Sequence, residues 1–124
     1  MNVWLIFIGA GLGGILRYFI SNGIYQLLGK QFPYGTLAVN ATGSFLMGLL
    51  FVLILERFDG LGQAWRSLVL IGLLGGYTTF SSFSIETLNL FENGAWLSAS
   101  MNILANVSLC ILLTWVGVLS GRQL

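Results

Sequence analysis

Polar side chains recur at four-residue intervals in two segments of a chain that is otherwise strongly apolar. The first segment carries Thr36, Asn40 and Ser44, and the second carries Ser98, Asn102, Asn106, Cys110 and Thr114. A spacing of four places side chains on one face of an α-helix. Their hydroxyl and amide groups are neutral hydrogen-bonding groups. Each stripe therefore suits either hydrogen bonding between helices or the lining of a path for a polar solute.

The segment Gly75-Gly76-Tyr77-Thr78-Thr79 predicts an interruption in an apolar helix. Glycine is a weak helix former, and threonine also ranks low because it is β-branched. Irregular backbone at membrane depth is tolerated where it is buried or lines a cavity, and carbonyl groups at such breaks often bind a cation. We therefore expect the third helix to be broken near its middle.

Two phenylalanines separated by hydroxyl side chains follow the expected break. Phe80 and Phe83 lie three residues apart on one helical face, and Ser81 and Ser82 stand between them. A phenylalanine pair is ordinarily core packing. Here the rings follow a break and alternate with hydroxyl groups, so their positive edges could instead face an anion.

Nine charged residues and no histidine limit the chemistry that this chain can perform. Charged residues make up 7% of the 124 residues and hydrophobic residues 56%, whereas soluble domains carry about 25% charged residues. The usual general base is missing, and the single cysteine, Cys110, has no partner for a disulfide within the chain. A net charge of +1 provides no basic patch for nucleic acid. We therefore expect a protein surrounded by membrane lipid that is not an enzyme and does not bind nucleic acid.

The uncharged runs are long enough for four transmembrane helices. A bilayer core about 30 Å thick needs about 20 helical residues. Such helices are expected at about residues 3–28, 34–56, 66–91 and 95–120. The turns between them are short, which predicts a single all-α domain over residues 1–124.

Two charged residues fall inside or directly beside the expected helices. Arg17 lies toward the far end of the first helix, where it would be either a snorkelling anchor at the headgroups or the electropositive vestibule of an anion path. Glu86 follows the apolar core of the third helix, as an interfacial residue or as a polar group at a pore mouth. The sequence leaves both pairs of alternatives open.

A G-x-G-x-x-G match runs from Gly9 to Gly14, but its surroundings do not suit a dinucleotide site. That motif needs a preceding strand and an acidic residue about 20 positions further on, and position 34 is Tyr. We interpret Gly9 and Gly13 instead as a small-residue face for close helix packing.

Taken together, these segments resemble the Fluc (CrcB-type) family of fluoride channels. The residues from Gly75 to Ser84 are similar to the third-helix signature of that family. Gly35-Thr36-Leu37-Ala38-Val39-Asn40 resembles its second-helix motif, and Gly14-Ile15-Leu16-Arg17-Tyr18 resembles its first-helix motif. The resemblance covers essentially the whole chain, in order and at the length of the family.

The resemblance implies an antiparallel, dual-topology homodimer in the bacterial inner membrane that lets toxic fluoride leave the cytoplasm passively. It implies a central sodium ion, structural and not transported, held by the backbone carbonyls of Gly75 and Thr78. The fluoride pore would be lined by aromatic, amide and hydroxyl side chains, namely Phe80, Phe83, Asn40, Ser81, Ser82, Thr36 and Thr114. Arg17 and Glu86 would stand at the vestibule.

Three residues depart from the pattern of the family. Tyr77 is bulkier than the usual residue, and Ser82 stands where threonine is common. Cys110 replaces a position that often carries a hydroxyl group. The last departure leaves open how the inner part of the fourth-helix stripe is built and what role Asn106 has there.

Two functions other than a channel also suit a small chain of four helices. A small multidrug-resistance type transporter, also dual-topology, depends on a membrane-embedded glutamate in its first helix, but no acidic residue precedes Glu56. A non-transporting accessory subunit would suit the glycine faces, but it explains neither the break nor the stripes.

Three arginines on one side of the expected membrane against Lys30 on the other give only a weak positive-inside bias. Both a fixed orientation with the N-terminus inside and insertion in both directions remain compatible with it.

Overall fold

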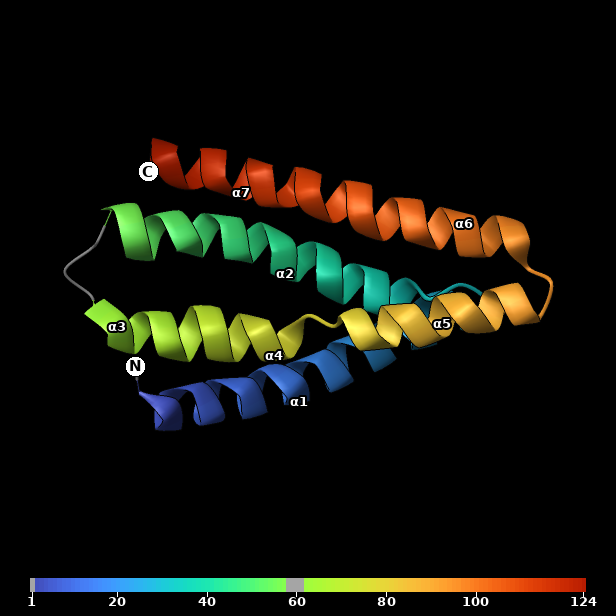
Figure 1. Ribbon diagram of the computed structural model, residues 1–124, viewed down its shortest axis with the longest axis horizontal. Helices are drawn as coiled ribbons and strands as arrows, with labels where there is room; N and C mark the ends of the chain where they lie inside the picture. The colour runs from blue at the N-terminus through green and yellow to red at the C-terminus, as the bar shows by residue number, and fades with distance from the viewer. Residues whose placement is uncertain (1, 58–61) are drawn as a thin grey trace.

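The computed structural model describes residues 2–57 and 62–124, and all regular structure within these two ranges is helical (Figure 1). Four helices in them are long and apolar enough to cross a membrane: Val3–Leu28, Tyr34–Arg57, Gly62–Glu92 and Trp96–Gln123. The expectation of an all-α membrane protein with four spanning helices is confirmed.

Changes in helical winding divide three of these helices into shorter elements. The first helix is α1 (Val3–Leu28), and the second is α2 (Tyr34–Val52) followed by the π-helical η1 (Leu53–Arg57). The third helix consists of α3 (Gly62–Trp65), the π-helical η3 (Arg66–Leu74), α4 (Gly75–Tyr77) and α5 (Phe80–Glu92). The fourth consists of α6 (Trp96–Leu104), the π-helical η4 (Ala105–Leu109) and α7 (Cys110–Gln123). Extended backbone interrupts the third helix between α4 and α5.

The helices pack as two close pairs that meet along α2. In one pair α1 packs against η3 and α4, and in the other α2 packs against α7; α1 also contacts α2. Both termini lie at one end of the bundle, and the connections from α1 to α2 and from α5 to α6 lie at the opposite end (Figure 1).

Glycines allow the close approach within each pair. A Cβ atom at Gly13 would lie 2.1 Å from the carbonyl oxygen of Leu73, and one at Gly9 would lie 2.2 Å from that of Leu68. In the second pair a Cβ atom at Gly48 would lie 2.1 Å from the carbonyl oxygen of Thr114. Backbone therefore packs directly on backbone, which confirms the interpretation of Gly9 and Gly13 as a packing face.

The third helix breaks at its two threonines and not at the glycines before them. Gly75 is helical (φ −63°, ψ −37°), whereas Thr78 (φ −81°, ψ 157°) and Thr79 (φ −150°, ψ 121°) are extended. Gly76 serves packing, because a Cβ atom there would lie 2.6 Å from the carbonyl oxygen of Ala10. Thr79 then caps α5, since its Oγ1 accepts a hydrogen bond from the N–H of Ser82 (3.2 Å).

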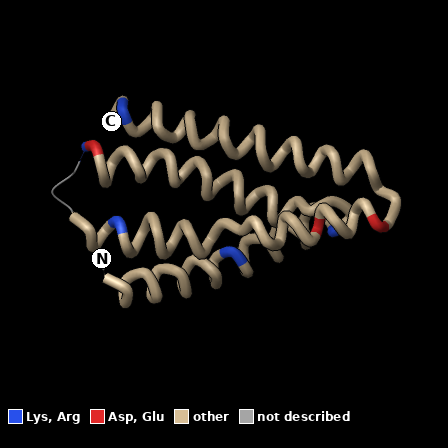
Figure 2. The backbone as a smooth tube through the Cα atoms, in the orientation of Figure 1, with Lys and Arg blue, Asp and Glu red and all other residues tan. Residues whose placement is uncertain are grey.

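Charged residues of the described chain are concentrated toward the two ends of the bundle, with few along the helices between (Figure 2). Near the termini Arg122 pairs with Glu56 (3.5 Å), and both side chains are exposed. Asp59 lies outside the described residues.

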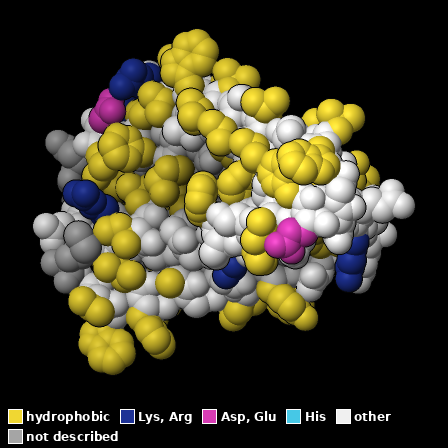
Figure 3. Space-filling model, turned by 45° about the vertical axis from the view of Figure 1, so that its right-hand side comes forward, with side chains coloured by type: hydrophobic (Ala, Val, Ile, Leu, Met, Phe, Trp, Pro, Cys, Tyr) yellow, Lys and Arg dark blue, Asp and Glu magenta, His cyan; other side chains and the backbone are white. Residues whose placement is uncertain are grey.

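Hydrophobic side chains are spread over the face of the molecule in Figure 3, and many large ones are exposed, among them Phe7 and Ile111. Such a surface suits lipid or a second apolar surface.

Candidate functional site at the helix break

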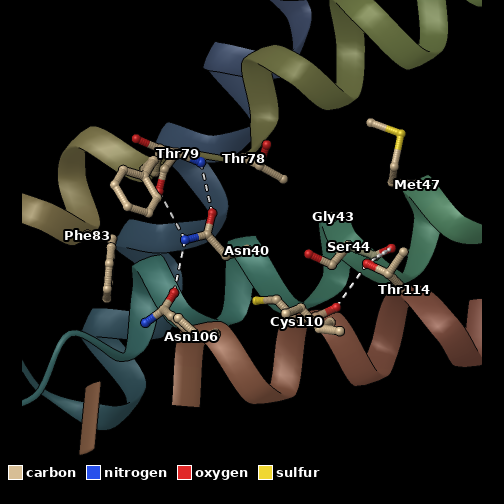
Figure 4. Close-up of a pocket in the computed structure, with 13 residues that line it drawn as sticks. Asn40, Gly43, Ser44, Met47, Thr78, Thr79, Phe83, Asn106, Cys110 and Thr114 are labelled. Atoms are coloured by element: carbon tan, nitrogen blue, oxygen red, sulfur yellow. Dashed lines mark hydrogen bonds between the residues drawn. The ribbon is translucent and has the colours of Figure 1, made fainter. Parts of the chain in front are cut away.

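The side chain of Asn40, on α2, bridges both backbone groups of Thr79 at the break (Figure 4). Its Oδ1 accepts a hydrogen bond from the N–H of Thr79 (2.8 Å), and its Nδ2 donates to the carbonyl oxygen of Thr79 (3.0 Å). In a continuous helix the N–H of Thr79 would bond to the carbonyl of Gly75. The amide of Asn40 thus replaces a helical hydrogen bond and stabilises the extended backbone at membrane depth.

A chain of side-chain hydrogen bonds continues from Asn40 into the fourth helix. Nδ2 of Asn40 donates to Oδ1 of Asn106 (3.0 Å), and Nδ2 of Asn106 donates to Oδ1 of Asn102 (2.9 Å). Nδ2 of Asn102 donates in turn to the hydroxyl oxygen of Thr87 on α5 (2.8 Å). Both N–H groups of the Asn40 amide are therefore bonded within this chain, one to Thr79 and the other to Asn106.

An open groove of about 380 Å³ lies beside the break, between α2, α5 and the fourth helix (Figure 4). Its 13 lining residues are all uncharged: Asn40, Gly43, Ser44, Met47, Thr78, Thr79, Phe80, Phe83, Asn106, Val107, Cys110, Ile111 and Thr114. Most of the surface of this groove is apolar, including the phenylalanine rings, and oxygen atoms without fixed charge supply the polar remainder.

The two phenylalanines on this groove differ in exposure. Their ring centroids lie 5.2 Å apart, and the ring planes are inclined by 58°. The residue Phe83 is 7% exposed, whereas Phe80 is 75% exposed. Phe83 therefore packs within one copy of the chain, and Phe80 projects from it.

A second cavity, of about 360 Å³, lies on the other side of Thr79, between α1, α2 and α5. Arg17, Thr36, Ser82 and Glu86 line it, together with Tyr25. The hydroxyl of Tyr25 donates to Oε2 of Glu86 (2.9 Å) and lies 3.5 Å from Oγ1 of Thr36. Among the described residues, the buried atoms Nε of Arg17 and Oε1 of Glu86 have no hydrogen-bond partner.

The structure thus divides the predicted pore residues between two cavities. Asn40, Phe80, Phe83 and Thr114 share the groove, and Thr36 and Ser82 share the second cavity with Arg17 and Glu86. Thr79 lines both cavities and forms the wall between them. Ser81 lines neither of the two; its side chain is exposed, and its Oγ lies 3.3 Å from Oγ1 of Thr79.

Sequence reasoning did not single out Tyr25, Thr79 or Thr87 as site residues. A signal for Tyr25 was present, because Arg17, Ser21 and Tyr25 repeat the four-residue spacing of the other stripes. The role of Thr79 depends on a contact with a residue 39 positions away. No spacing within one helix could have predicted that contact.

Comparison with known proteins identifies a matching family and several named relatives of this chain. The family model described as CrcB-like protein, Camphor Resistance (CrcB), matches residues 4–118. A protein of Coxiella burnetii (strain Dugway 5J108-111), named Fluoride-specific ion channel FluC, is 64% identical over 124 residues, and the match covers 100% of both chains. Proteins of the same name from Magnetococcus marinus and Methylococcus capsulatus are 47% and 48% identical. The match covers 98% of this chain and 98% of the Magnetococcus protein, and 100% of this chain but 54% of the Methylococcus protein.

Proposed function

The chain belongs to the CrcB-like family, and from this premise we propose that it is a fluoride-specific ion channel of the cell membrane. The observation that carries the proposal is the 64% identity, over the full length of both chains, with a protein of that name. The relatives are named as ion channels, so the chain is not assigned an enzymatic activity, and the transporter alternative gains no support.

The lining of the groove suits an anion that is small and strongly hydrated. Fluoride must lose water to pass a narrow path, and hydroxyl groups and aromatic edges can replace part of that water. A ring of lysines or arginines in the same place would bind the ion too tightly for release. The edges of Phe80 and Phe83 are the groups that we assign to this exchange. The hydroxyl of Thr114 donates its one hydrogen to the carbonyl oxygen of Cys110 (2.9 Å), so it would have to turn away from that carbonyl to serve the ion. Asn40 holds the break, since both N–H groups of its amide are bonded, one to Thr79 and the other to Asn106.

Charge enters the proposed path only at the second cavity. The guanidinium group of Arg17 would attract an anion to the mouth of the path. Glu86 would repel it there, and the hydrogen bond from the hydroxyl of Tyr25 holds its carboxylate in place without removing the charge. We assign these residues to the vestibule, with Thr36 and Ser82 between the vestibule and the break.

We propose that the working unit is an antiparallel homodimer. The groove is open in one copy, and Phe80 projects from it with 75% of its side chain exposed. A second copy would close the groove and cover this ring. The basic residues give only a weak bias toward one orientation in the membrane, which suits insertion in both directions. Conduction in such a dimer is passive, so fluoride would leave the cytoplasm down its own gradient.

The break also suits the structural sodium ion that we propose between the two copies. The N–H of Thr79, which would bond to the carbonyl of Gly75 in a continuous helix, donates to Asn40 instead. Carbonyls in the last turn of a helix carry partial negative charge. Gly75 is exposed, and a Cβ atom there would have no neighbour closer than 3.9 Å. The described residues hold no cluster of three acidic, cysteine or histidine side chains. Backbone oxygens of Gly75 and Thr78 are therefore the ligands proposed for this ion, which would supply positive charge between the two breaks.

Fluoride efflux from liposomes tests the channel. Purified protein is reconstituted into liposomes loaded with potassium fluoride, a potassium ionophore is added, and a fluoride electrode records release. We expect rapid efflux of fluoride and none of chloride from matched chloride-loaded liposomes. Absence of fluoride release, or release that requires a proton gradient, would contradict the proposal.

A further inference from the structure

We propose that Thr87 and Asn102 are positioning residues for the fluoride path, which hold Asn106 and through it Asn40 in place without touching the ion. The inference rests on the proposed channel function. Their side chains are 7% and 1% exposed, and neither residue lines the groove or the second cavity. They act through the hydrogen bonds that connect them to Asn40.

The first step is the hydroxyl group of Thr87. It has one hydrogen, which it donates to the carbonyl oxygen of Phe83 (2.7 Å). Toward Asn102 the hydroxyl oxygen can therefore only accept. It accepts from Nδ2 of Asn102 (2.8 Å), so the amide of Asn102 must turn its nitrogen toward α5 and its oxygen away.

The second step carries this orientation to Asn106. Oδ1 of Asn102 accepts from Nδ2 of Asn106 (2.9 Å), which also donates to the backbone carbonyl of Asn102 (3.0 Å). Because Nδ2 of Asn106 is held by two acceptors, its Oδ1 is the atom presented to Asn40. It accepts there from Nδ2 of Asn40 (3.0 Å).

The last step returns the chain to the break. The N–H of Thr79 can only donate, and it donates to Oδ1 of Asn40 (2.8 Å). The five bonds therefore run in one direction, from the N–H of Thr79 through three asparagines and Thr87 to the carbonyl of Phe83. Both ends lie in the first turn of α5 or directly before it, beside Phe80 and Phe83. The chain clamps the aromatic part of the groove to α2 and to the fourth helix.

Loss of the Thr87 hydroxyl would disturb the side-chain bonds of Asn102 and Asn106. Nδ2 of Asn102 would lie buried without an acceptor, which is costly in an apolar interior. If the Asn102 amide turned over to avoid this, its nitrogen would face the nitrogen of Asn106. Asn106 would then keep only its bond to the backbone carbonyl of Asn102, and its hold on Asn40 would weaken, although Thr79 still bonds both ends of the Asn40 amide.

Substitution of Thr87 tests the inference in full-length protein in liposomes. Thr87→Val keeps the shape of the side chain and removes the hydroxyl, whereas Thr87→Ser keeps the hydroxyl. Ser84→Ala is the matched control, because the hydroxyl of Ser84, also on α5, donates to the carbonyl of Phe80 in its own helix and has no part in the chain. Asn102→Leu breaks the same chain one bond further on.

Liposomes that hold at most one channel separate a positioning role from a merely structural one. The fraction of liposomes that empty counts the active channels, and the rate at which each empties gives the unitary fluoride flux. We expect Thr87→Val and Asn102→Leu to lower the unitary flux by roughly two- to thirtyfold, the range for residues that couple through a network. Thr87→Ser and Ser84→Ala should match the wild type. The double variant should conduct no less than Asn102→Leu alone, since both changes break one chain.

A fall in the active fraction with unchanged unitary flux in Thr87→Val would overturn the inference, because it would show that Thr87 only supports folding. Amide hydrogen exchange at Thr79 gives a readout that does not need conduction. We expect faster exchange there in Thr87→Val than in the wild type and in Ser84→Ala, and equal exchange would also overturn the inference. Wild-type protein that fails to empty liposomes would instead refute the proposed channel function. The exchange measurement would still decide the inference about Asn40.

Discussion

Asn40 and Thr79 are joined by two hydrogen bonds in which one side-chain amide serves a backbone N–H and a backbone C=O at once. The two residues come from different helices, and the pair is what allows extended backbone at Thr79 in the middle of an apolar bundle. A carboxamide offers a donor and an acceptor in this geometry without titrating, whereas a carboxyl group offers both only when it is protonated. The pair therefore fixes the position of the break and favours a carboxamide at position 40.

Replacement of Asn40 by Asp should abolish most fluoride conduction. A carboxylate can accept from the N–H of Thr79, but it cannot donate to the carbonyl of Thr79 or to Oδ1 of Asn106, and its charge would repel an anion in the groove. Each acceptor left without its donor costs about 1–3 kcal/mol. Thermal unfolding in detergent and efflux from liposomes measure the two effects. Wild-type flux in Asn40→Asp would mean that the break does not need the amide.

Phe80 and Phe83 should both be required for flux, but with different costs to stability. An aromatic edge contact contributes about 1 kcal/mol, so Phe80→Ile and Phe83→Ile should each lower unitary fluoride flux by about fivefold or more. Phe83 is buried within one copy and Phe80 is not. Only Phe83→Ile should therefore lower the stability of the isolated subunit.

The control for the two phenylalanines is the oligomeric state, measured by size-exclusion chromatography with light scattering. Each variant should still assemble as the wild type does. Undiminished flux in an assembled Phe→Ile variant would mean that the ring serves packing and does not line the fluoride path.

Gly13 and Gly11 should respond in opposite ways to alanine. A Cβ atom at Gly13 would lie 2.1 Å from the carbonyl of Leu73, whereas nothing lies within 4 Å of one at Gly11. Gly13→Ala should destabilise the protein by about 1–3 kcal/mol through overpacking. Gly11→Ala should be neutral or stabilise it by up to about 1 kcal/mol, because alanine is the better helix former. Thermal unfolding of the two variants checks this, and equal effects would refute the assigned packing of α1 on η3.

The sequence predicted the parts of this fold that depend on local patterns. Apolar runs of sufficient length predicted the four helices, and small residues four apart predicted the packing face at Gly9 and Gly13. The interruption of the third helix was also predicted, but its place was attributed in part to Gly75 and Gly76, which are helical. Thr79 determines that place as the cap of α5, together with Asn40 from another helix.

The grouping of site residues could not be predicted in the same way. Four-residue spacing placed Asn102, Asn106 and Thr114 on one stripe, but only Asn106 and Thr114 line the groove, because Asn102 turns toward Thr87. Which side chains meet depends on helix rotation and on partners remote in sequence. Arg17 and Glu86 share a cavity across 69 positions of the chain, and nothing in either local segment indicates that contact.

Gly75 gives a prediction for the proposed dimer and its sodium ion that does not depend on the packing of one copy. Within a single chain Gly75→Ala is accommodated, since the nearest atom to the added Cβ is the carbonyl oxygen of Leu70 at 3.9 Å. The helix content of the subunit should therefore stay unchanged. If two copies meet around an ion at this carbonyl, the added methyl group lies where the partner or the ion must approach. Gly75→Ala should then weaken dimerisation and raise the sodium concentration needed for fluoride flux, measured with sodium replaced by a large organic cation.

Gly76→Ala is the contrasting variant, because its Cβ would clash with Ala10 in the same chain and lower the stability of the subunit itself. Normal dimerisation and unchanged sodium dependence in Gly75→Ala would place the partner and the ion elsewhere.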